Sequence, residues 1–117
     1  MLVQILEVRD YMNLFSLLKK EINQQELLNY YNTTIVYDKL PKGINGLVFS
    51  YENIYIIVIN KILSYYKKRK TIIHELAHIE LNQLNQINKE LFAFNVDKYE
   101  DEADKYIKFL CETINND

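Results

Sequence analysis

Apolar side chains recur at helical spacing in three parts of the chain. They do so over residues 1–31, where a weak point around Asn23–Gln25 leaves room for either one or two N-terminal packing helices. The same spacing returns over residues 64–82, where Ser64 can cap the start of a helix. It returns again over residues 97–114. The pattern therefore predicts an N-terminal helical part and two later helices.

A different pattern fills residues 33–60, which are rich in β-branched and aromatic side chains. Thr33–Tyr37 predicts a first strand, which is followed by a turn that contains the only proline and both glycines. Gly46–Tyr51 and Asn53–Ile59 predict two antiparallel strands, and the second is apolar on both of its faces. A small sheet is therefore expected in the middle of the chain.

This order of elements is typical of one α+β domain over residues 1–117, with a loop at the Asn/Gln-rich stretch 82–88. A chain of 117 residues is long enough for one core and too short for two ordinary domains. Hydrophobic residues make up 49% of it, which favours a folded protein over a disordered one.

Charge and cysteine content narrow the possible functions. Lys and Arg number 14 against 16 Asp and Glu, so no net positive field supports direct nucleic-acid binding. The basic run Lys67–Lys70 is more typical of a solvated helix face. Cys111 is the only cysteine, which excludes an internal disulfide and fits a reducing compartment. We expect it to be a small buried residue.

The sequence also predicts a soluble cytoplasmic protein. The N-terminal run Leu2–Val8 is interrupted by polar residues and lacks the basic head of a signal peptide. No window approaches 18 uncharged apolar residues, so no membrane span is expected.

Both histidines of the chain lie in the run His74-Glu75-Leu76-Ala77-His78, inside the second predicted helix. Positions 74 and 78 lie roughly 40° apart around a helix axis and about 6 Å apart along it, so two imidazoles can converge on one cation. Glu75 lies on the adjoining flank, where its carboxylate can reach a metal-bound water without ligating the metal. The HExxH pattern predicts a zinc hydrolase, and the alternative is a pair of structural histidines.

A catalytic zinc usually takes three protein ligands, and no third histidine exists in this chain. Carboxylates of the last predicted helix are the remaining candidates, and spacing alone leaves all of them open. The alternative is a solvated acidic face at a helix start. The candidates are Asp97, Glu100, Asp101, Glu102 and Asp104.

From about Leu40 to Leu110 the chain resembles the ImmA/IrrE-type metallopeptidases of bacterial mobile elements and phage-derived regions. The matching pieces are the turn Leu40–Leu47, the strand into Ile59–Asn60, the run Arg69–His78 and the segment Glu100–Tyr106. This resemblance implies a zincin-like fold, in which a small three-stranded sheet packs against the HExxH helix and a C-terminal helix that carries a ligand.

The resemblance also implies roles for individual residues. His74, His78 and Glu100 would hold Zn²⁺, and Asp104 would orient a zinc-bound histidine. Glu75 would take a proton from water and return it to the leaving amine. Glu102 competes with Glu100 as the third ligand. Asp97 followed by Glu100 can also be interpreted as an acidic capping box, in which Glu100 would face the backbone.

The implied function is that of a zinc-dependent endopeptidase whose protein substrate is a helix-turn-helix repressor of a mobile element or phage. Asn53–Ile59 could pair with an extended substrate if one of its edges is free, and the alternative is an ordinary core strand. Two other functions stay open. One is a non-proteolytic, metal-binding regulator that acts by protein–protein contact, and the other is an α+β interaction module without metal.

Overall fold

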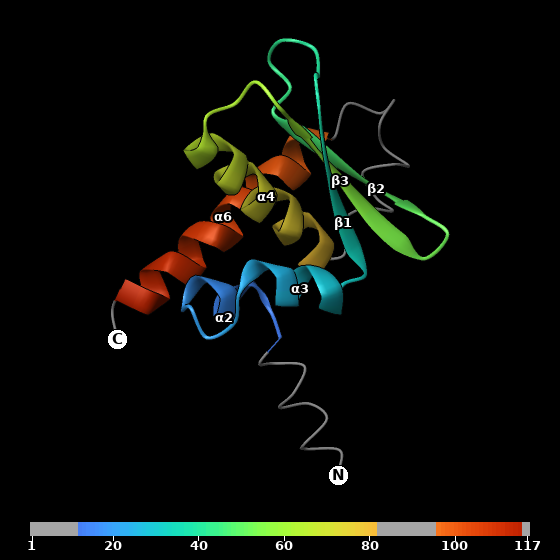
Figure 1. Ribbon diagram of the computed structural model, residues 1–117. Helices are drawn as coiled ribbons and strands as arrows, with labels where there is room; N and C mark the ends of the chain where they lie inside the picture. Colours follow the sequence, from blue (N-terminus) through green and yellow to red (C-terminus); the bar gives the residue numbers. More distant parts are fainter. Residues whose placement is uncertain (1–11, 82–95, 116–117) are drawn as a thin grey trace.

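The computed structural model describes residues 12–81 and 96–115, and its elements form the expected α+β arrangement (Figure 1). The N-terminal residues 1–11 of the predicted helical part and the predicted loop 82–88 lie outside the described residues. No helix in the described ranges has both the length and the apolar character needed to cross a membrane. In chain order the elements are α2 (Leu14–Leu18), α3 (Gln24–Tyr30), β1 (Thr33–Asp38), β2 (Gly46–Tyr51), β3 (Ile54–Asn60), α4 (Tyr65–Glu80) and α6 (Val96–Asn115).

Two short helices, α2 and α3, occupy the described part of the N-terminal helical pattern. The Asn13 side chain caps α2 by accepting a hydrogen bond from the Ser16 amide at 2.9 Å. Asn23 caps α3 within a capping box, because its side chain accepts from the Glu26 amide while the Glu26 carboxylate accepts from the Asn23 amide. The weak point around Asn23–Gln25 is therefore the start of a second helix.

The three strands form one mixed sheet in the order β1-β3-β2. β1 runs parallel to β3, and β2 runs antiparallel to it, as the sequence predicts for the second and third strands. Glu52 and Asn53 join β2 to β3 with φ values of 47° and 69°, as in a two-residue hairpin turn. Because Asn53 belongs to this turn, β3 begins one residue later than predicted.

β3 is the central strand of the sheet, and both of its edges are paired. Ile57 lies between Ile35 of β1 and Val48 of β2, and the Ile57 and Ile59 side chains are fully buried. Substrate pairing by this strand requires a free edge, which the structure does not provide. The interpretation of Asn53–Ile59 as a substrate-binding strand is therefore wrong, and this strand is part of the core.

α4 lies at the centre of the fold, between the sheet and the other helices (Figure 1). It contacts β2 and β3 on one side and α2 and α6 on the other. Ser64 caps it as predicted, because its hydroxyl accepts from the Lys67 amide at 3.2 Å. The apolar side chains that α4 and α6 bury are Ile72, Leu76, Ala77, Ile79, Ala103 and Leu110.

A second contact between the helices is polar and is centred on Glu80, near the end of α4. The Glu80 carboxylate accepts hydrogen bonds from the Leu14 amide at 2.7 Å, from the Tyr31 hydroxyl at 2.9 Å and from the Tyr106 hydroxyl. Burial, together with this carboxylate, raises the pKa of both phenols, so both remain protonated donors. We call these four residues the Glu80 cluster, and they join α4 to α2, to the residue after α3 and to α6.

The prediction that Cys111 is buried is wrong, because its side chain is exposed. Among the described side chains of α6, those from residue 100 to residue 115, Ala103 and Leu110 are buried, and they lie seven residues apart on nearly the same face. Cys111 follows Leu110 by one residue and is therefore rotated by about 100° from that face. It turns toward solvent for this reason.

Candidate metal centre

His74 and His78 lie one turn apart on α4 and point toward the same space. Their Nε2 atoms are 3.1 Å apart, and their ring planes are nearly perpendicular, at 87°. The His78 side chain is 1% exposed, because it lies on the side of α4 that enters the core, whereas that of His74 is 19% exposed. The helix spacing predicted from the sequence therefore brings both imidazoles together.

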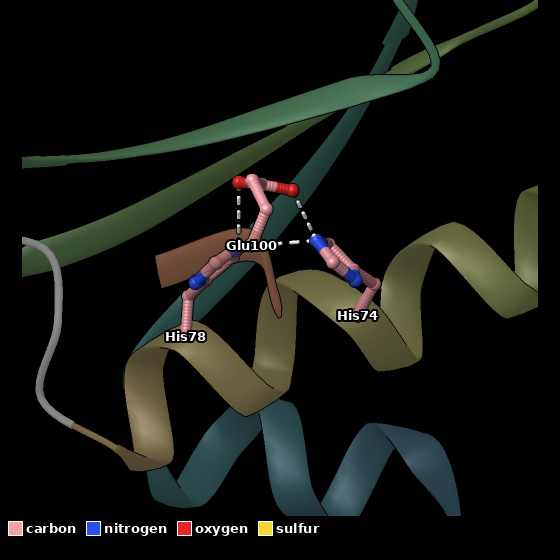
Figure 2. Close-up of side chains that lie close together, drawn as sticks. All are labelled: His74, His78 and Glu100. Atoms are coloured by element: carbon pink, nitrogen blue, oxygen red, sulfur yellow. Dashed lines mark hydrogen bonds and ion pairs between the residues drawn. The ribbon is translucent and has the colours of Figure 1, made fainter. Parts of the chain in front are cut away.

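Glu100 reaches this pair from the first turns of α6 (Figure 2). One of its carboxylate oxygens lies 2.6 Å from His74 Nε2, and the other lies 2.9 Å from His78 Nε2. Glu100 lies 25 positions after Glu75 in the sequence. It reaches the histidines because α4 and α6, the two helices that carry these residues, pack side by side. The three side chains form the only group of potential metal ligands among the described residues, and their ligand atoms all lie within 4.8 Å of one another.

The donor set and its charge both fit a bound cation. Two imidazole nitrogens and a carboxylate oxygen are donors that zinc and other transition metals accept. Two Nε2 lone pairs at 3.1 Å would repel each other unless a positive charge lay beside them. Without a metal ion, a proton supplies that charge, since the hydrogen bond to Glu100 raises the pKa of His74 to about 9 against the opposing effect of burial. The bonds to both histidines lower the pKa of Glu100 to about 2.

Asp104 lies one turn after Glu100 on α6 and contacts the opposite side of the His74 ring. Its Oδ1 is 2.9 Å from His74 Nδ1. A carboxylate can only accept at ordinary pH, so Nδ1 must carry the hydrogen. In the neutral ring this leaves the lone pair on Nε2, which is the nitrogen that faces Glu100 and His78. The arrangement therefore presents His74 in the tautomer that can ligate a metal.

Glu75 follows His74 and is buried, with 6% of its surface exposed. Burial raises the pKa of its carboxyl group to about 7, although both neighbouring histidines act in the opposite direction. A carboxyl group with this pKa can both accept and release a proton near neutral pH. Glu75 therefore has the properties required of an acid–base residue.

A hollow of about 550 Å³ opens over these groups. It is lined on one side by residues of α4 and the start of α6, and on the other side by the segment that leads into β2. Gly46, the first residue of β2, must lie close to α4, because a Cβ there would approach the Thr71 methyl group to 2.7 Å. The lining residues are Gly43, Ile44, Asn45, Gly46, Lys67, Lys70, Thr71, His74, Glu75, Glu100 and Asp104.

Among the carboxylates that the sequence leaves open as the third ligand, the structure brings Glu100 to the histidines. Asp101 pairs with Lys105 at 2.9 Å, and Glu102 is exposed and lies outside the ligand group. Asp97 belongs to α6, which begins at Val96. Glu100 points to the histidines and not to the backbone, contrary to the capping-box alternative.

Sequence reasoning missed two features around this site. The Glu80 cluster, just after His78, depends on residues 49 and 66 positions away in the chain, and no local pattern indicates such contacts. Lys67 and Lys70 line the hollow, although the sequence pattern indicates only a solvated face for the basic run. Helical spacing indicates the position of Lys70, because residues four positions apart lie on the same face of a helix and Lys70 precedes His74 by four.

An HExxH helix whose two histidines meet a glutamate from a second helix, beneath a small sheet, defines a zincin-like fold with a candidate metal centre. The family Peptidase_M78, described as the IrrE N-terminal-like domain, matches residues 28–106, which is more than half of the chain. The chain therefore belongs to this family, and the resemblance to ImmA/IrrE-type proteins is confirmed. No curated protein and no solved structure matches it. Membership supports a metallopeptidase-type function that acts on protein.

Proposed function

We propose that this protein is a zinc-dependent endopeptidase. The observation that supports it most strongly is the convergence of His74, His78 and Glu100, with the buried acid Glu75 lining the same hollow. A purely structural metal site has no use for an acid–base residue with a pKa near 7 in an accessible hollow. The fourth position of such a site is left to water and substrate.

His74, His78 and Glu100 would hold the ion, and Asp104 would keep His74 in the ligating tautomer. When bound, zinc supplies Lewis acidity that lowers the pKa of water toward 7 and polarises the carbonyl of the scissile bond. The Glu75 carboxylate accepts the proton of the attacking water. It then donates this proton to the leaving amine, for which a pKa of about 7 is well suited.

An extended substrate would pair with β2 and not with β3. Among the described residues, β2 pairs on one side only, with β3. Its first residue, Gly46, lines the hollow that contains Glu75. Main-chain pairing at an exposed edge holds a peptide without requiring a particular side-chain sequence. We therefore assign to β2 the substrate-pairing role that the sequence analysis considers for Asn53–Ile59.

We further propose a helix-turn-helix repressor of a mobile element or phage as the substrate, in a cytoplasmic setting. The resemblance to ImmA/IrrE-type proteins supports this choice. Incubation of the zinc-loaded protein with a repressor encoded beside it tests the proposal, with intact mass as the readout. We expect two fragments whose masses sum to that of the repressor plus one water. An uncleaved repressor would contradict this substrate.

The peptidase activity itself is tested with a peptide library derived from a whole proteome. Wild-type protein with zinc should cleave it, and the Glu75→Gln variant should bind zinc and cleave it about 10³-fold more slowly. Glu102→Gln is the matched control, because it removes the same charge at an exposed position outside the ligand group. If both the wild-type protein and the Glu75→Gln variant inactivate the repressor without cleaving it, the non-proteolytic regulator would be favoured instead.

A further inference from the structure

The hollow over the metal centre has two ends of opposite charge, and only one of them contains the ligands. Glu75, Glu100 and Asp104 lie at the ligand end. Lys67 and Lys70, which are exposed on α4, line the same hollow at its other end. We call these two lysines the basic end of the hollow.

The two lysines have no carboxylate partner in the described part of the chain. Three other lysines of the molecule do have partners: Lys105 pairs with Asp101, Lys19 pairs with Glu21, and the Lys68 ammonium lies 5.6 Å from the centre of the Tyr37 ring. The wall opposite the basic end is Gly43–Gly46, which contains no charged residue. An anion that enters the hollow would therefore find two uncompensated ammonium groups.

Helix geometry places these ammonium groups within the span of a bound peptide. Lys70 precedes His74 by four residues and Lys67 precedes it by seven, which correspond to about 6 Å and about 10 Å along the axis of α4. An extended peptide advances about 3.3 Å per residue. A substrate that runs along α4 from the metal centre would therefore bring a side chain to the basic end about two or three residues from the scissile bond.

The close approach of β2 to α4 confines a bound substrate to this path along α4. Because Gly46 packs against Thr71, the segment Gly43–Gly46 lies close to α4 and lines the same hollow as the two lysines. A chain paired with the start of β2 therefore passes between this segment and the basic end.

We infer that the basic end is a specificity subsite for a carboxylate of the substrate, so that the enzyme prefers an acidic residue about two or three positions to one side of the cleaved bond. This inference rests on the proposed peptidase function and names the substrate class of the same site. Lys67 and Lys70 act as specificity residues, and they take no part in the proton transfers assigned to Glu75.

The test is a comparison of cleavage sites in the peptide library, prepared with free or amidated C-termini, among zinc-loaded wild type and variants. These are the wild type, the double variant Lys67→Glu/Lys70→Glu and the control Lys68→Glu, whose side chain lies over Tyr37 and outside this hollow. A Lys67→Ala/Lys70→Ala variant is included in case charge reversal perturbs folding, and zinc content and thermal unfolding are measured for each protein.

We expect the wild type and Lys68→Glu to show Asp and Glu enriched at one position beside the cleaved bond. The charge-reversed variant should lose this preference by about tenfold in kcat/KM and favour basic residues, and the alanine variant should lose it about three- to tenfold. Enrichment that survives C-terminal amidation identifies a side-chain carboxylate, and enrichment that requires a free C-terminus identifies the terminal one.

Cleavage by the wild type without acidic enrichment, or with an enrichment that both double variants retain, would overturn the subsite and leave the peptidase function intact. An absence of cleavage by the zinc-loaded wild type would overturn the proposed function, and the subsite with it. The two failures are therefore distinguishable in one experiment.

Discussion

Glu75 and Glu80 lie five residues apart on α4 and differ in their hydrogen-bond partners. Glu80 accepts hydrogen bonds from three donors that come from three other parts of the chain. Glu75 is buried beside the candidate metal ligands, and no described residue donates a hydrogen bond to its carboxylate. The Glu80 carboxylate therefore has hydrogen-bond donors from the protein, whereas the Glu75 carboxylate remains available to a ligand in the hollow.

This difference separates the positioning role of Glu80 from the chemical role that we propose for Glu75. The Glu80 cluster ties α4 to α6, which is the contact that brings Glu100 to the two histidines. Glu75 lacks such partners, and burial raises the pKa of its carboxyl group to about 7. A shifted pKa in a group that lines a hollow is typical of a functional residue.

The largest effects are expected when each of these glutamates is changed to glutamine. Glu75→Gln should lower kcat/KM by about 10³-fold with unchanged zinc content, because glutamine cannot carry the proton. Glu80→Gln should lower the free energy of unfolding by about 1–3 kcal/mol and change kcat/KM of the folded fraction by less than about threefold. Peptide hydrolysis and urea unfolding measure the two effects, and an interchange of the two outcomes would refute the assignment.

A second prediction concerns the support of His74. Asp104→Ala should weaken zinc binding by about tenfold, because the ring loses the acceptor that fixes its tautomer. Competition with a chromophoric chelator measures this affinity. Asp101→Ala, which removes a neighbouring carboxylate that pairs with Lys105, is the control and should bind zinc as the wild type does.

A third prediction follows from the charge at the site. The pKa of His74 is raised from its ordinary value to about 9, so a proton competes with the metal at neutral pH. Apparent zinc affinity should therefore rise between pH 6 and pH 8, by up to about tenfold per pH unit. Chelator competition at several pH values tests this trend, and an affinity that does not change over this range would contradict the proton-for-metal exchange.

The smallest expected effect is in the Glu80 cluster. Tyr106→Phe removes one donor to Glu80 and should lower the free energy of unfolding by about 1 kcal/mol. Tyr66→Phe, at an exposed position on α4, is the matched control and should leave stability unchanged. Urea unfolding followed by circular dichroism compares the two, and equal midpoints would show that Tyr106 contributes nothing to the contact between the helices.

Much of the fold could be predicted from local patterns. The Ser64 cap, the start of α3 near Asn23 and the antiparallel pairing of β2 with β3 all depend on residues close together in sequence. The parallel pairing of β1 with β3 and the central place of β3 depend on contacts between residues about 22 positions apart, such as Thr33 with Tyr55. No spacing rule indicated those contacts.

The candidate site shows the same division. His74 and His78 could be predicted to meet, since one turn of one helix separates them. The proximity of Glu100, and not Glu102, to the histidines depends on how α6 packs against α4, which spacing along the sequence does not indicate. The positions of Lys67 and Lys70 in the hollow depend likewise on the wall at Gly43–Gly46.

The most direct test of the central claim is the metal content of three proteins after identical dialysis in chelator-free buffer: wild type, Glu100→Ala and Glu102→Ala. Elemental mass spectrometry should find about one zinc per chain in wild type and in Glu102→Ala, and far less in Glu100→Ala. Equal zinc in all three proteins would contradict the ligand role of Glu100. No zinc in the wild type after reconstitution would contradict the metal centre itself.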